Sequence, residues 1–376
     1  MTHKKSFPFQ AYLGQPEHQA FFFFTLASGF ALTLLSKIDS FSLIPTLLIE
    51  ILIIIITRKI ASGRGYQTEY NKHVQKQALS GKTALVIGCA GGIGHLTAQK
   101  IAALGPDNLI LAVRGRERAE RLAKEISILS LKTDVVGYDL DISSLESIKE
   151  FVSLIKAKYT SIDLLIDNAG MLQSPYAKEY KLTPEGLEPT FATNCIGPFY
   201  LVELLLPLLL KEKGTRVLIV GSIAHYYFAQ KGIDYSLITR SEAQVKNNPS
   251  EYHNAVLYGQ SKLGNIFHLR DLNQKYEKDY GLTAYCVHPG TIDTGLNRNF
   301  PWLFRRGFSS LLKLIGKTME DGVQTTLFCA LSNDAVPGEF HQDCGVGFAA
   351  DVSFDQRKID EFCKNMRDII QEKIKS

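Results

Sequence analysis

From Thr83 onward, short apolar runs alternate with longer segments of helical periodicity. The short runs are apolar throughout, which is typical of strands covered on both faces of a parallel sheet. The predicted strands are Ala84–Ile87, Leu109–Val113, Val135–Tyr138, Leu164–Ile166, Val217–Val220 and Ala284–Val287. The predicted helices are Ile93–Leu104, Arg116–Ile128, Leu145–Lys158, Phe191–Lys211 and Ala255–Tyr280. This order predicts an α/β domain with a doubly wound parallel sheet over residues 81–376.

A strongly apolar stretch precedes this domain. It contains two apolar runs, Phe21–Ser36 and Phe41–Thr57, each near the lower limit of the roughly 20 residues that cross a bilayer. Residues 1–60 are therefore predicted to form an N-terminal hydrophobic membrane segment, most simply a hairpin, and residues 61–80 a polar linker. Basic residues flank the segment on both sides, at positions 4, 5, 58, 59 and 64. By the positive-inside rule both ends lie in the cytoplasm, with Lys37–Ser40 as the far turn.

Two residues weaken the second run as a full membrane span, namely Pro45 and Glu50. A hairpin that dips into one leaflet, an interfacial anchor and a buried pair of soluble helices therefore stay open. A secretory signal peptide fits poorly, because the apolar region is long and no small-residue cleavage site follows it.

Composition narrows the class of protein further. The chain has 376 residues, which is enough for one large or two ordinary domains. Its net charge is only +4 and no long basic run is present, so nucleic acid is not an expected partner. The six cysteines show no C-x-x-C pair and no metal-like spacing, so we expect reduced thiols and no metal site.

A glycine-rich turn, Gly88-Cys89-Ala90-Gly91-Gly92-Ile93-Gly94, lies between the first predicted strand and the first helix. Glycines let the backbone turn sharply and approach a pyrophosphate, and the helix N-terminus presents its N–H groups to the negative charge. An ordinary turn also uses glycine, but this position favours a dinucleotide site that includes Gly88, Gly92, Ile93 and Gly94.

The end of the second predicted strand indicates which nicotinamide cofactor binds. An acid there suits the ribose of NAD, whereas an arginine suits the 2′-phosphate of NADP. The chain has Arg114 at this point, with Arg116 as a helper, so we expect NADP(H). The alternative is that both arginines are solvated at a helix start. Asp141 follows the third strand and is a candidate for the adenine amino group or, alternatively, for a helix N-cap.

Candidate catalytic residues follow in a fixed order: Asn168-Ala169-Gly170, Asn194, Ser222 and Tyr258-x-x-x-Lys262. Tyrosine and lysine four residues apart lie on the same helix face, where the lysine charge favours the phenolate. A free tyrosine has a pKa of about 10, so this help matters for proton exchange near neutrality. Tyr227-x-x-x-Lys231 has the same spacing, but no helical run precedes it, and we interpret it as coincidental.

With these motifs, residues 82–370 resemble the short-chain dehydrogenase/reductase family, which implies a Rossmann-type fold. Within that family the chain is most similar to the retinol-dehydrogenase-like branch. The stretches that carry the resemblance are Phe191–Gly197, Tyr258–Asn265, Val287–Thr291, Asp321–Thr326 and Gly338–Cys344.

The resemblance implies a catalytic tetrad of Asn194, Ser222, Tyr258 and Lys262. Tyr258 would exchange a proton with the substrate oxygen, and Ser222 would orient the carbonyl. Lys262 would also bind the nicotinamide ribose, and Asn194 would hold a water that relays protons to it. Taken singly, each residue has a simpler reading: a strand-end hydroxyl for Ser222, a helix-interior amide with a backbone partner for Asn194, and a solvated lysine for Lys262.

The resemblance also implies that Asn168-Ala169-Gly170 supports the fourth strand and that Pro289-Gly290-Thr291 borders the nicotinamide. Five positions depart from the branch pattern: Ile87, Asp167, Cys195, Pro198 and Gly221. None removes a tetrad group. The polar stretch Thr239–Asn254 lengthens the interval before Tyr258, so a retinoid substrate does not carry over directly.

The apolar and basic segment Phe300–Phe308, with the leucines and isoleucine that follow, is expected to cover the substrate. It would lie against a bilayer or pack on its own core. The sequence thus predicts a membrane-bound NADP(H)-dependent oxidoreductase acting on a lipophilic alcohol or carbonyl, such as a retinoid, polyprenoid, steroid or fatty aldehyde. A 3-ketoacyl or 3-ketosphinganine reductase is one alternative, and a non-catalytic NADP-binding membrane scaffold is another.

The expected location is the endoplasmic reticulum membrane with the catalytic domain facing the cytosol, and lipid droplets or a mitochondrial membrane are alternatives. Membrane lipid is an expected partner. The sequence leaves open whether the protein forms a homo-oligomer.

Overall fold

The computed structural model describes residues 16–35, 43–173, 182–240, 253–293, 302, 306, 309–310, 312–313 and 316–375. Its centre is an eight-stranded sheet in the order β3-β2-β1-β4-β5-β6-β7-β8. The strands are β1 Thr83–Ile87, β2 Asn108–Val113, β3 Asp134–Asp139, β4 Leu164–Asp167, β5 Arg216–Val220, β6 Thr283–His288, β7 Phe340–Gln342 and β8 Gly345–Val346. The first seven run parallel, and β8 pairs with β7 antiparallel.

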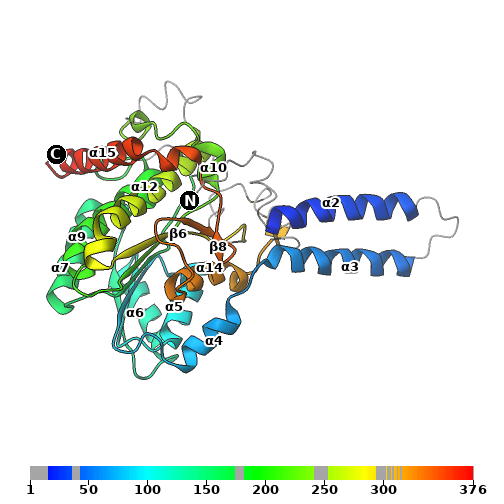
Figure 1. Cartoon of the computed structure of the whole chain (residues 1–376), viewed down its shortest axis with the longest axis horizontal. Coiled ribbons are helices and arrows are strands. Elements are labelled where there is room, and N and C mark those ends of the chain that lie inside the picture. The colour runs from blue at the N-terminus through cyan, green and yellow to red at the C-terminus, as the bar shows by residue number, and fades with distance from the viewer. Residues whose placement is uncertain are drawn as a thin grey trace.

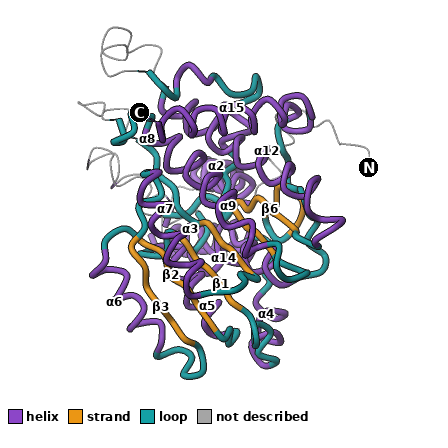
Figure 2. Tube along the Cα trace, turned by 90° about the vertical axis from the view of Figure 1, so that its left-hand side faces the viewer, coloured by secondary structure: helices purple, strands orange, loops and turns teal. Residues whose placement is uncertain are grey.

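Helices cover both faces of this sheet (Figure 1). On one face lie α5 Gly92–Ala103, α6 Arg116–Ser127 and α14 Met319–Leu331, and on the other α7 Leu145–Lys158, α9 Gly197–Leu209 and α12 Asn254–Tyr280. Figure 2 shows the strands between helices from a second direction. The sheet order reverses between β1 and β4, which opens a crevice at the carboxyl ends of the strands.

Alternate side chains of the central strands fill two separate cores. On β4, Leu164 and Ile166 pack on the side of α5, α6 and α14, whereas Leu165 packs on the side of α7, α9 and α12. A third cluster joins α12 to α15 Gln356–Lys375 through Phe267, Phe362 and their neighbours. Each predicted strand and helix of the α/β domain has a counterpart, so the doubly wound fold is confirmed.

The helical run predicted at Phe191–Lys211 consists of three parts. These are α8 Pro189–Phe191, a π-helical segment Ala192–Ile196 and α9. Gly197 lets this helix approach the loop after β3, since a Cβ there would lie 1.8 Å from the Ile142 carbonyl oxygen. A π segment widens the helix by one residue per turn, and this one contains Asn194.

The N-terminal segment forms two antiparallel helices, α2 Pro16–Leu35 and α3 Leu43–Ser62, that project together from the α/β domain (Figure 1). The predicted turn at Lys37–Ser40 lies outside the described residues. Residues 61–80 are not simply a linker, because they contain α4 Gln67–Gln75, whose Tyr70 is buried and donates a hydrogen bond to the Lys100 carbonyl oxygen at 2.8 Å. The helices α10 Ala224–Phe228, α14 and α15 and the strands β7 and β8 also lie outside the sequence prediction.

Apolar length alone does not identify a membrane helix in this chain. Within the described residues, the stretch Pro189–Leu209 is long and apolar enough to cross a bilayer, yet 72% of it is buried in the α/β domain. It is therefore a core helix. Gln19–Gly29 in α2 forms a shorter apolar helix.

Candidate active site

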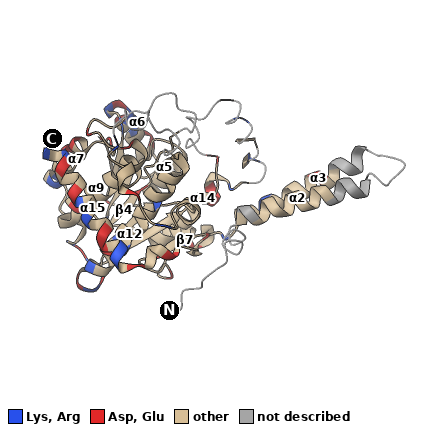
Figure 3. Ribbon diagram, turned by 90° about the horizontal axis from the view of Figure 1, so that it is seen from above, with Lys and Arg blue, Asp and Glu red and all other residues tan. Residues whose placement is uncertain are grey.

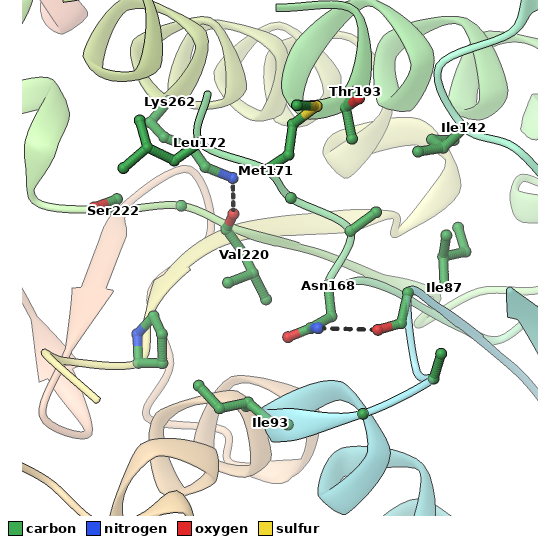
Figure 4. Close-up of a pocket in the computed structure, with 18 of the residues that line it drawn as sticks. Ile87, Ile93, Ile142, Asn168, Met171, Leu172, Thr193, Val220, Ser222 and Lys262 are labelled. Carbon is green, nitrogen blue, oxygen red and sulfur yellow. Dashed lines mark hydrogen bonds between the residues drawn. The ribbon is translucent and has the colours of Figure 1, made fainter. Parts of the chain in front are cut away.

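A cavity of about 1020 Å³ lies at the carboxyl ends of the parallel strands (Figure 4). The loops after β1, β2, β3, β4, β5 and β6 all contribute to its wall, as expected where the sheet order reverses. Most of the candidate residues line it: Gly88, Gly92, Ile93, Arg114, Asp141, Asn168, Ala169, Gly170, Ser222, Tyr258, Lys262, Pro289, Gly290 and Thr291. The two that do not are Gly94 and Asn194.

The glycine turn leaves the start of α5 open to the cavity. Gly88 has φ +72°, and a Cβ at this position would lie 2.6 Å from the Ala169 nitrogen. Gly92 has φ +59°, with nothing within 4 Å of a Cβ placed there. The start of α5 therefore lines open space in the cavity, and a helix N-terminus there fits the pyrophosphate of a dinucleotide.

Asn168 clamps this turn from β4. Its Nδ2 donates to the Gly88 carbonyl oxygen at 3.3 Å, as the dashed line in Figure 4 shows. Gly94 packs against the same pair, because a Cβ on Gly94 would lie 2.4 Å from the Gly88 oxygen and 2.5 Å from Asn168 Nδ2. Gly94 thus serves helix packing, and the cavity wall at this point is formed by Ile93.

Arg114 and Asp141 face each other at the opposite end of the cavity. The Arg114 guanidinium lies 3.6 Å from Asp141 Oδ2, and its side chain is 68% exposed. The other Asp141 oxygen accepts from the Ser143 backbone N–H at 3.0 Å, while Ser144 caps α7. Asp141 is therefore not the N-cap of α7.

The predicted helper of Arg114 lies elsewhere. Arg116 does not line the cavity and instead donates to Glu120 at 3.1 Å. Arg118, two residues after Arg116 on α6, lines the cavity together with Arg114. Helical periodicity alone favours neither arginine, because the approach of α6 to the cavity decides which side chain reaches it.

Ser222 is held by the loop after β5. Its Oγ accepts from the Ala224 N–H at 3.2 Å, and its carbonyl oxygen lies 2.6 Å from His225 Nδ1. His225 Nε2 accepts from the Ala350 N–H at 3.3 Å, so Nδ1 carries the proton and donates to Ser222. Burial lowers the pKa of His225 to about 4, which keeps the ring neutral. His225 is a positioning residue that the motif search missed.

Tyr258 and Lys262 lie on one face of α12, and both line the same cavity as Ser222. The Lys262 ammonium is 5.8 Å from the Tyr258 ring centroid and donates to the Val220 carbonyl oxygen at 2.8 Å (Figure 4). Burial raises the pKa of Tyr258, and the neighbouring Ser222 opposes that rise. The sequence predicted a lowered tyrosine pKa. In this structure burial outweighs that effect, since the ammonium is directed at Val220.

Asp167 is a second buried charge beside Lys262. It ends β4 on the same side as Leu165, toward α12, and is 2% exposed. Oδ1 accepts from the Ala169 N–H at 3.0 Å, and Oδ2 has no hydrogen-bond partner. Burial raises the pKa of Asp167 to about 7, and Lys262 opposes that rise. Burial lowers the pKa of Lys262, while Asp167, Cys286 and Cys195 oppose that fall.

Asn194 does not line the cavity, and both polar atoms of its side chain are hydrogen-bonded within the protein. Its Oδ1 accepts from the Met171 N–H at 2.8 Å, and its Nδ2 donates to the Met171 carbonyl oxygen at 3.0 Å and to Ser261 at 3.1 Å. The amide therefore ties the π segment to the loop after β4. This geometry matches the simpler interpretation of Asn194, with backbone partners for its side chain, and Thr193 lines the cavity in its place.

Two departures from the branch pattern are explained by packing. A Cβ on Gly221 would lie 2.3 Å from Cys286 Sγ, so the cysteine occupies the space of a larger residue at 221. Cys195 Sγ lies 2.4 Å from the position of a Cβ on Gly264, which brings α12 close to the π segment. The second tyrosine–lysine pair, Tyr227 and Lys231, lies outside the cavity wall.

Two predicted segments near the mouth are only partly described. Thr239–Asn254 is described at its ends, and Phe300–Phe308 only at Trp302 and Arg306. Among the later residues of that region, Leu312 lines the cavity.

Comparison with known proteins independently supports the assignment to the short-chain dehydrogenase/reductase family. A family model described as short chain dehydrogenase matches residues 82–237. Retinol dehydrogenase 12 of Mus musculus is 33% identical over 270 residues, covering 71% of this chain and 79% of that protein. Retinol dehydrogenase 11 of Homo sapiens is 32% identical over 274 residues, covering 72% and 80%. The WW domain-containing oxidoreductase of Gallus gallus is 32% identical, and the match spans 72% of this chain but only 64% of that protein.

Solved structures show the same fold at lower identity. An uncharacterized protein of Mycobacterium paratuberculosis is 24% identical with a TM-score of 0.56, over 78% of this chain and 94% of that one. A short chain dehydrogenase of Escherichia coli CFT073 complexed with NADPH is 22% identical with a TM-score of 0.53, over 71% and 98%.

Proposed function

Because the chain belongs to the short-chain dehydrogenase/reductase family, close to its retinol-dehydrogenase-like branch, we propose that it is a membrane-bound oxidoreductase that interconverts a lipophilic alcohol and its carbonyl with NADP(H). One observation carries this proposal. The glycine turn, Arg114, Ser222 and the pair Tyr258 and Lys262 on α12 come from four different parts of the chain and line a single cavity.

The cavity has room for a dinucleotide along the glycine turn and for a substrate carbonyl beside Ser222 and Tyr258. Gly88 and Gly92 form the pyrophosphate cradle at the start of α5, and Lys262 is the candidate for the nicotinamide ribose. Bound there, the nicotinamide supplies or accepts a hydride at the substrate carbon.

The protein's own groups handle the proton. In the direction of reduction, the Tyr258 hydroxyl donates its proton to the substrate oxygen as the carbonyl becomes an alkoxide. Ser222, which lines the same cavity as Tyr258, orients that oxygen. Lys262 favours the phenolate that remains, and its charge is in turn compensated by Asp167. Oxidation uses the same groups in reverse.

The choice of NADP(H) rests on charge at the far end of the cavity. Arg114 and Arg118 line this end, and a guanidinium matches the geometry of a phosphate. The Arg114 guanidinium lies 3.6 Å from Asp141 Oδ2, while Asp141 Oδ1 accepts from Ser143.

Membrane attachment rests on the hairpin of α2 and α3. In Figure 3 most of the described ribbon of this hairpin is tan, the colour of residues other than Lys, Arg, Asp and Glu. Several of its large apolar side chains are between 51% and 61% exposed, namely Leu26, Leu48, Ile51, Leu52 and Ile55. A patch of this kind on a projecting hairpin fits a bilayer, and a lipophilic substrate follows from that placement. We propose the endoplasmic reticulum with the α/β domain in the cytosol.

The proposal is tested with full-length protein in detergent or vesicles. Carbonyl-containing fractions of a lipid extract are screened with NADPH by loss of its absorbance, with Tyr258→Phe as the inactive control. We expect at least one lipophilic fraction to be reduced by the wild type alone. Cofactor binding without turnover on any fraction would instead favour the non-catalytic scaffold.

The membrane part has its own test. Carbonate extraction should leave full-length protein in the pellet and release a chain that lacks residues 1–60. Protease should digest the α/β domain on the outside of sealed microsomes. A full-length chain that washes off in carbonate would refute membrane integration without affecting the chemistry.

A further inference from the structure

The turn between β7 and β8 has an unusual backbone. Gln342 pairs with Gly345, so Asp343 and Cys344 form a two-residue hairpin turn. Both have positive φ, +50° and +53°. This is the geometry of a type I′ turn, in which the second position normally carries glycine. A cysteine in this conformation is strained, and such strain persists where surrounding contacts hold it in place.

The contacts that hold the turn lead to the base of the N-terminal hairpin. Asp343 Oδ1 accepts from the Arg64 backbone N–H at 2.6 Å. Cys344 Sγ lies 3.6 Å from the Arg64 carbonyl oxygen, and the Cys344 N–H donates to Thr325 at 3.2 Å. Gly63 has φ +64°, and a Cβ there would lie 2.0 Å from Asp343 Oδ1. The end of α3 is thus shaped to meet the Asp343 carboxylate.

The same carboxylate oxygen binds a buried lysine on the other side. Lys317 Nζ lies 3.2 Å from Asp343 Oδ1, with the two side chains 3% and 18% exposed. A poorly solvated ammonium needs this partner, so the pair is costly to separate.

Lys317 in turn belongs to the mouth of the cavity. Its backbone N–H donates to the Thr291 carbonyl oxygen at 3.2 Å, and it forms a β-bridge with Ile292. Gly316, the residue before it, donates to the Leu312 carbonyl oxygen at 2.7 Å. Thr291, Ile292 and Leu312 all line the cavity. A continuous chain of contacts therefore runs from the hairpin through Asp343 and Lys317 to the cavity mouth.

Two further contacts join the hairpin to the same region. Ser62 Oγ donates to Asp321 Oδ2 at 3.2 Å, next to the start of α14. The Arg58 guanidinium donates to the Lys313 carbonyl oxygen. Both cross the same boundary as Asp343, but neither reaches a residue that lines the cavity.

We propose that Asp343 is a positioning residue that fixes the cavity mouth at the base of the hairpin, and that this coupling selects substrates delivered from a bilayer. The inference rests on the proposed function. Asp343 touches neither the cofactor end of the cavity nor the tetrad. Its effect is therefore on the entry of a membrane-borne substrate and not on the chemical step.

The test compares two carbonyl substrates with NADPH: a small water-soluble aldehyde, and a long-chain carbonyl carried in phosphatidylcholine vesicles. Asp343→Ala should lower kcat/KM for the vesicle-borne substrate by about ten-fold or more, because it removes the partner of both the Arg64 N–H and the Lys317 ammonium. The soluble substrate and the NADPH dissociation constant should change by less than about two-fold. Asp343→Asn keeps one acceptor oxygen and should fall between. Asp355→Asn, at a half-buried carboxylate beside Arg357 and away from the cavity wall, is the matched control.

A second readout needs no turnover. Trypsin cleavage after Arg64 in detergent should be faster in Asp343→Ala than in wild type, because the backbone at Arg64 loses its hydrogen bond. Equal losses for both substrates, or equal cleavage rates, would overturn the role of Asp343. A wild type that reduces neither substrate would instead count against the proposed function, while the cleavage rates still report on the coupling.

Discussion

The two ends of the cavity are built in opposite ways. At the cofactor end, Arg114 is 68% exposed and Asp141 35% exposed. At the catalytic end, Lys262 is 3% exposed and Asp167 2% exposed. Charges in solvent are screened and adjust to a ligand, whereas buried charges must be paired before the ligand arrives. We therefore expect recognition of the cofactor to depend on a few exposed side chains. Proton transfer, in contrast, should depend on how the core buries Lys262 and Asp167.

The largest expected effect is at the catalytic end. Tyr258→Phe removes only the hydroxyl that exchanges the proton, so kcat should fall by about 100- to 10 000-fold. NADP(H) affinity, measured by fluorescence titration, should stay nearly unchanged. Tyr227→Phe, at the coincidental pair outside the cavity, is the matched control and should retain full activity. Substantial turnover in Tyr258→Phe would show that Tyr258 is not the proton donor at the catalytic end of the cavity.

Asp167→Asn tests whether the buried carboxylate at the catalytic end lowers the stability of the folded protein as the pH rises. Burial raises the pKa of Asp167 to about 7, against roughly 4 in an unfolded chain. An acid with a raised pKa contributes stability that is present at low pH and lost as pH rises from about 4 to about 7. The loss amounts to about 4 kcal/mol, since one pKa unit corresponds to about 1.4 kcal/mol.

The Tm of Asp167→Asn relative to wild type should therefore rise between pH 5 and pH 8. Lys262 adds to this rise in Tm. Without its carboxylate partner its pKa falls further, and a base with a lowered pKa in the folded state makes the variant more stable as the pH rises. Thermal unfolding at a series of pH values measures the difference directly. A gap in Tm that does not change with pH would show that Asp167 does not titrate in this range.

Lys262→Ala should damage both turnover and cofactor affinity. We propose that the lysine binds the ribose as well as favouring the phenolate, and a lost charged hydrogen bond weakens binding by about ten- to one-hundred-fold. Steady-state kinetics and NADPH titration separate the two effects. Lys231→Ala supplies the control, and an unchanged NADPH affinity in Lys262→Ala would exclude the ribose contact.

The smallest effect is expected at the exposed end. Arg114→Ala should weaken NADP by about ten-fold, near the lower limit for a charged hydrogen bond because solvent screens the contact, and should leave NAD almost unaffected. Stability should not change. Arg116→Ala, outside the cavity wall, is the control. Equal losses for NADP and NAD would show that Arg114 does not read the 2′-phosphate.

Much of the fold is predictable because its signals are local. The apolar runs, the glycine turn and the four-residue spacing of Tyr258 and Lys262 all act within one element or between neighbours. Apolar character was less informative. The run that ends in α9 and the run that forms α3 look alike along the chain, yet one is 72% buried in the core and the other carries exposed leucines and isoleucines. Only the contacts of the folded chain distinguish them.

The sequence by itself determined the doubly wound sheet, the position of the glycine turn and most of the residues that converge on the cavity. Tertiary structure alone decided how those residues are used. It directed the Lys262 ammonium to Val220, gave the Asn194 amide to Met171, buried Asp167 beside the lysine and set Asp343 under the hairpin. The physical reason is separation along the chain. Spacing within an element is set by backbone geometry, but a partner tens or hundreds of residues away is chosen only when burial removes the competing water.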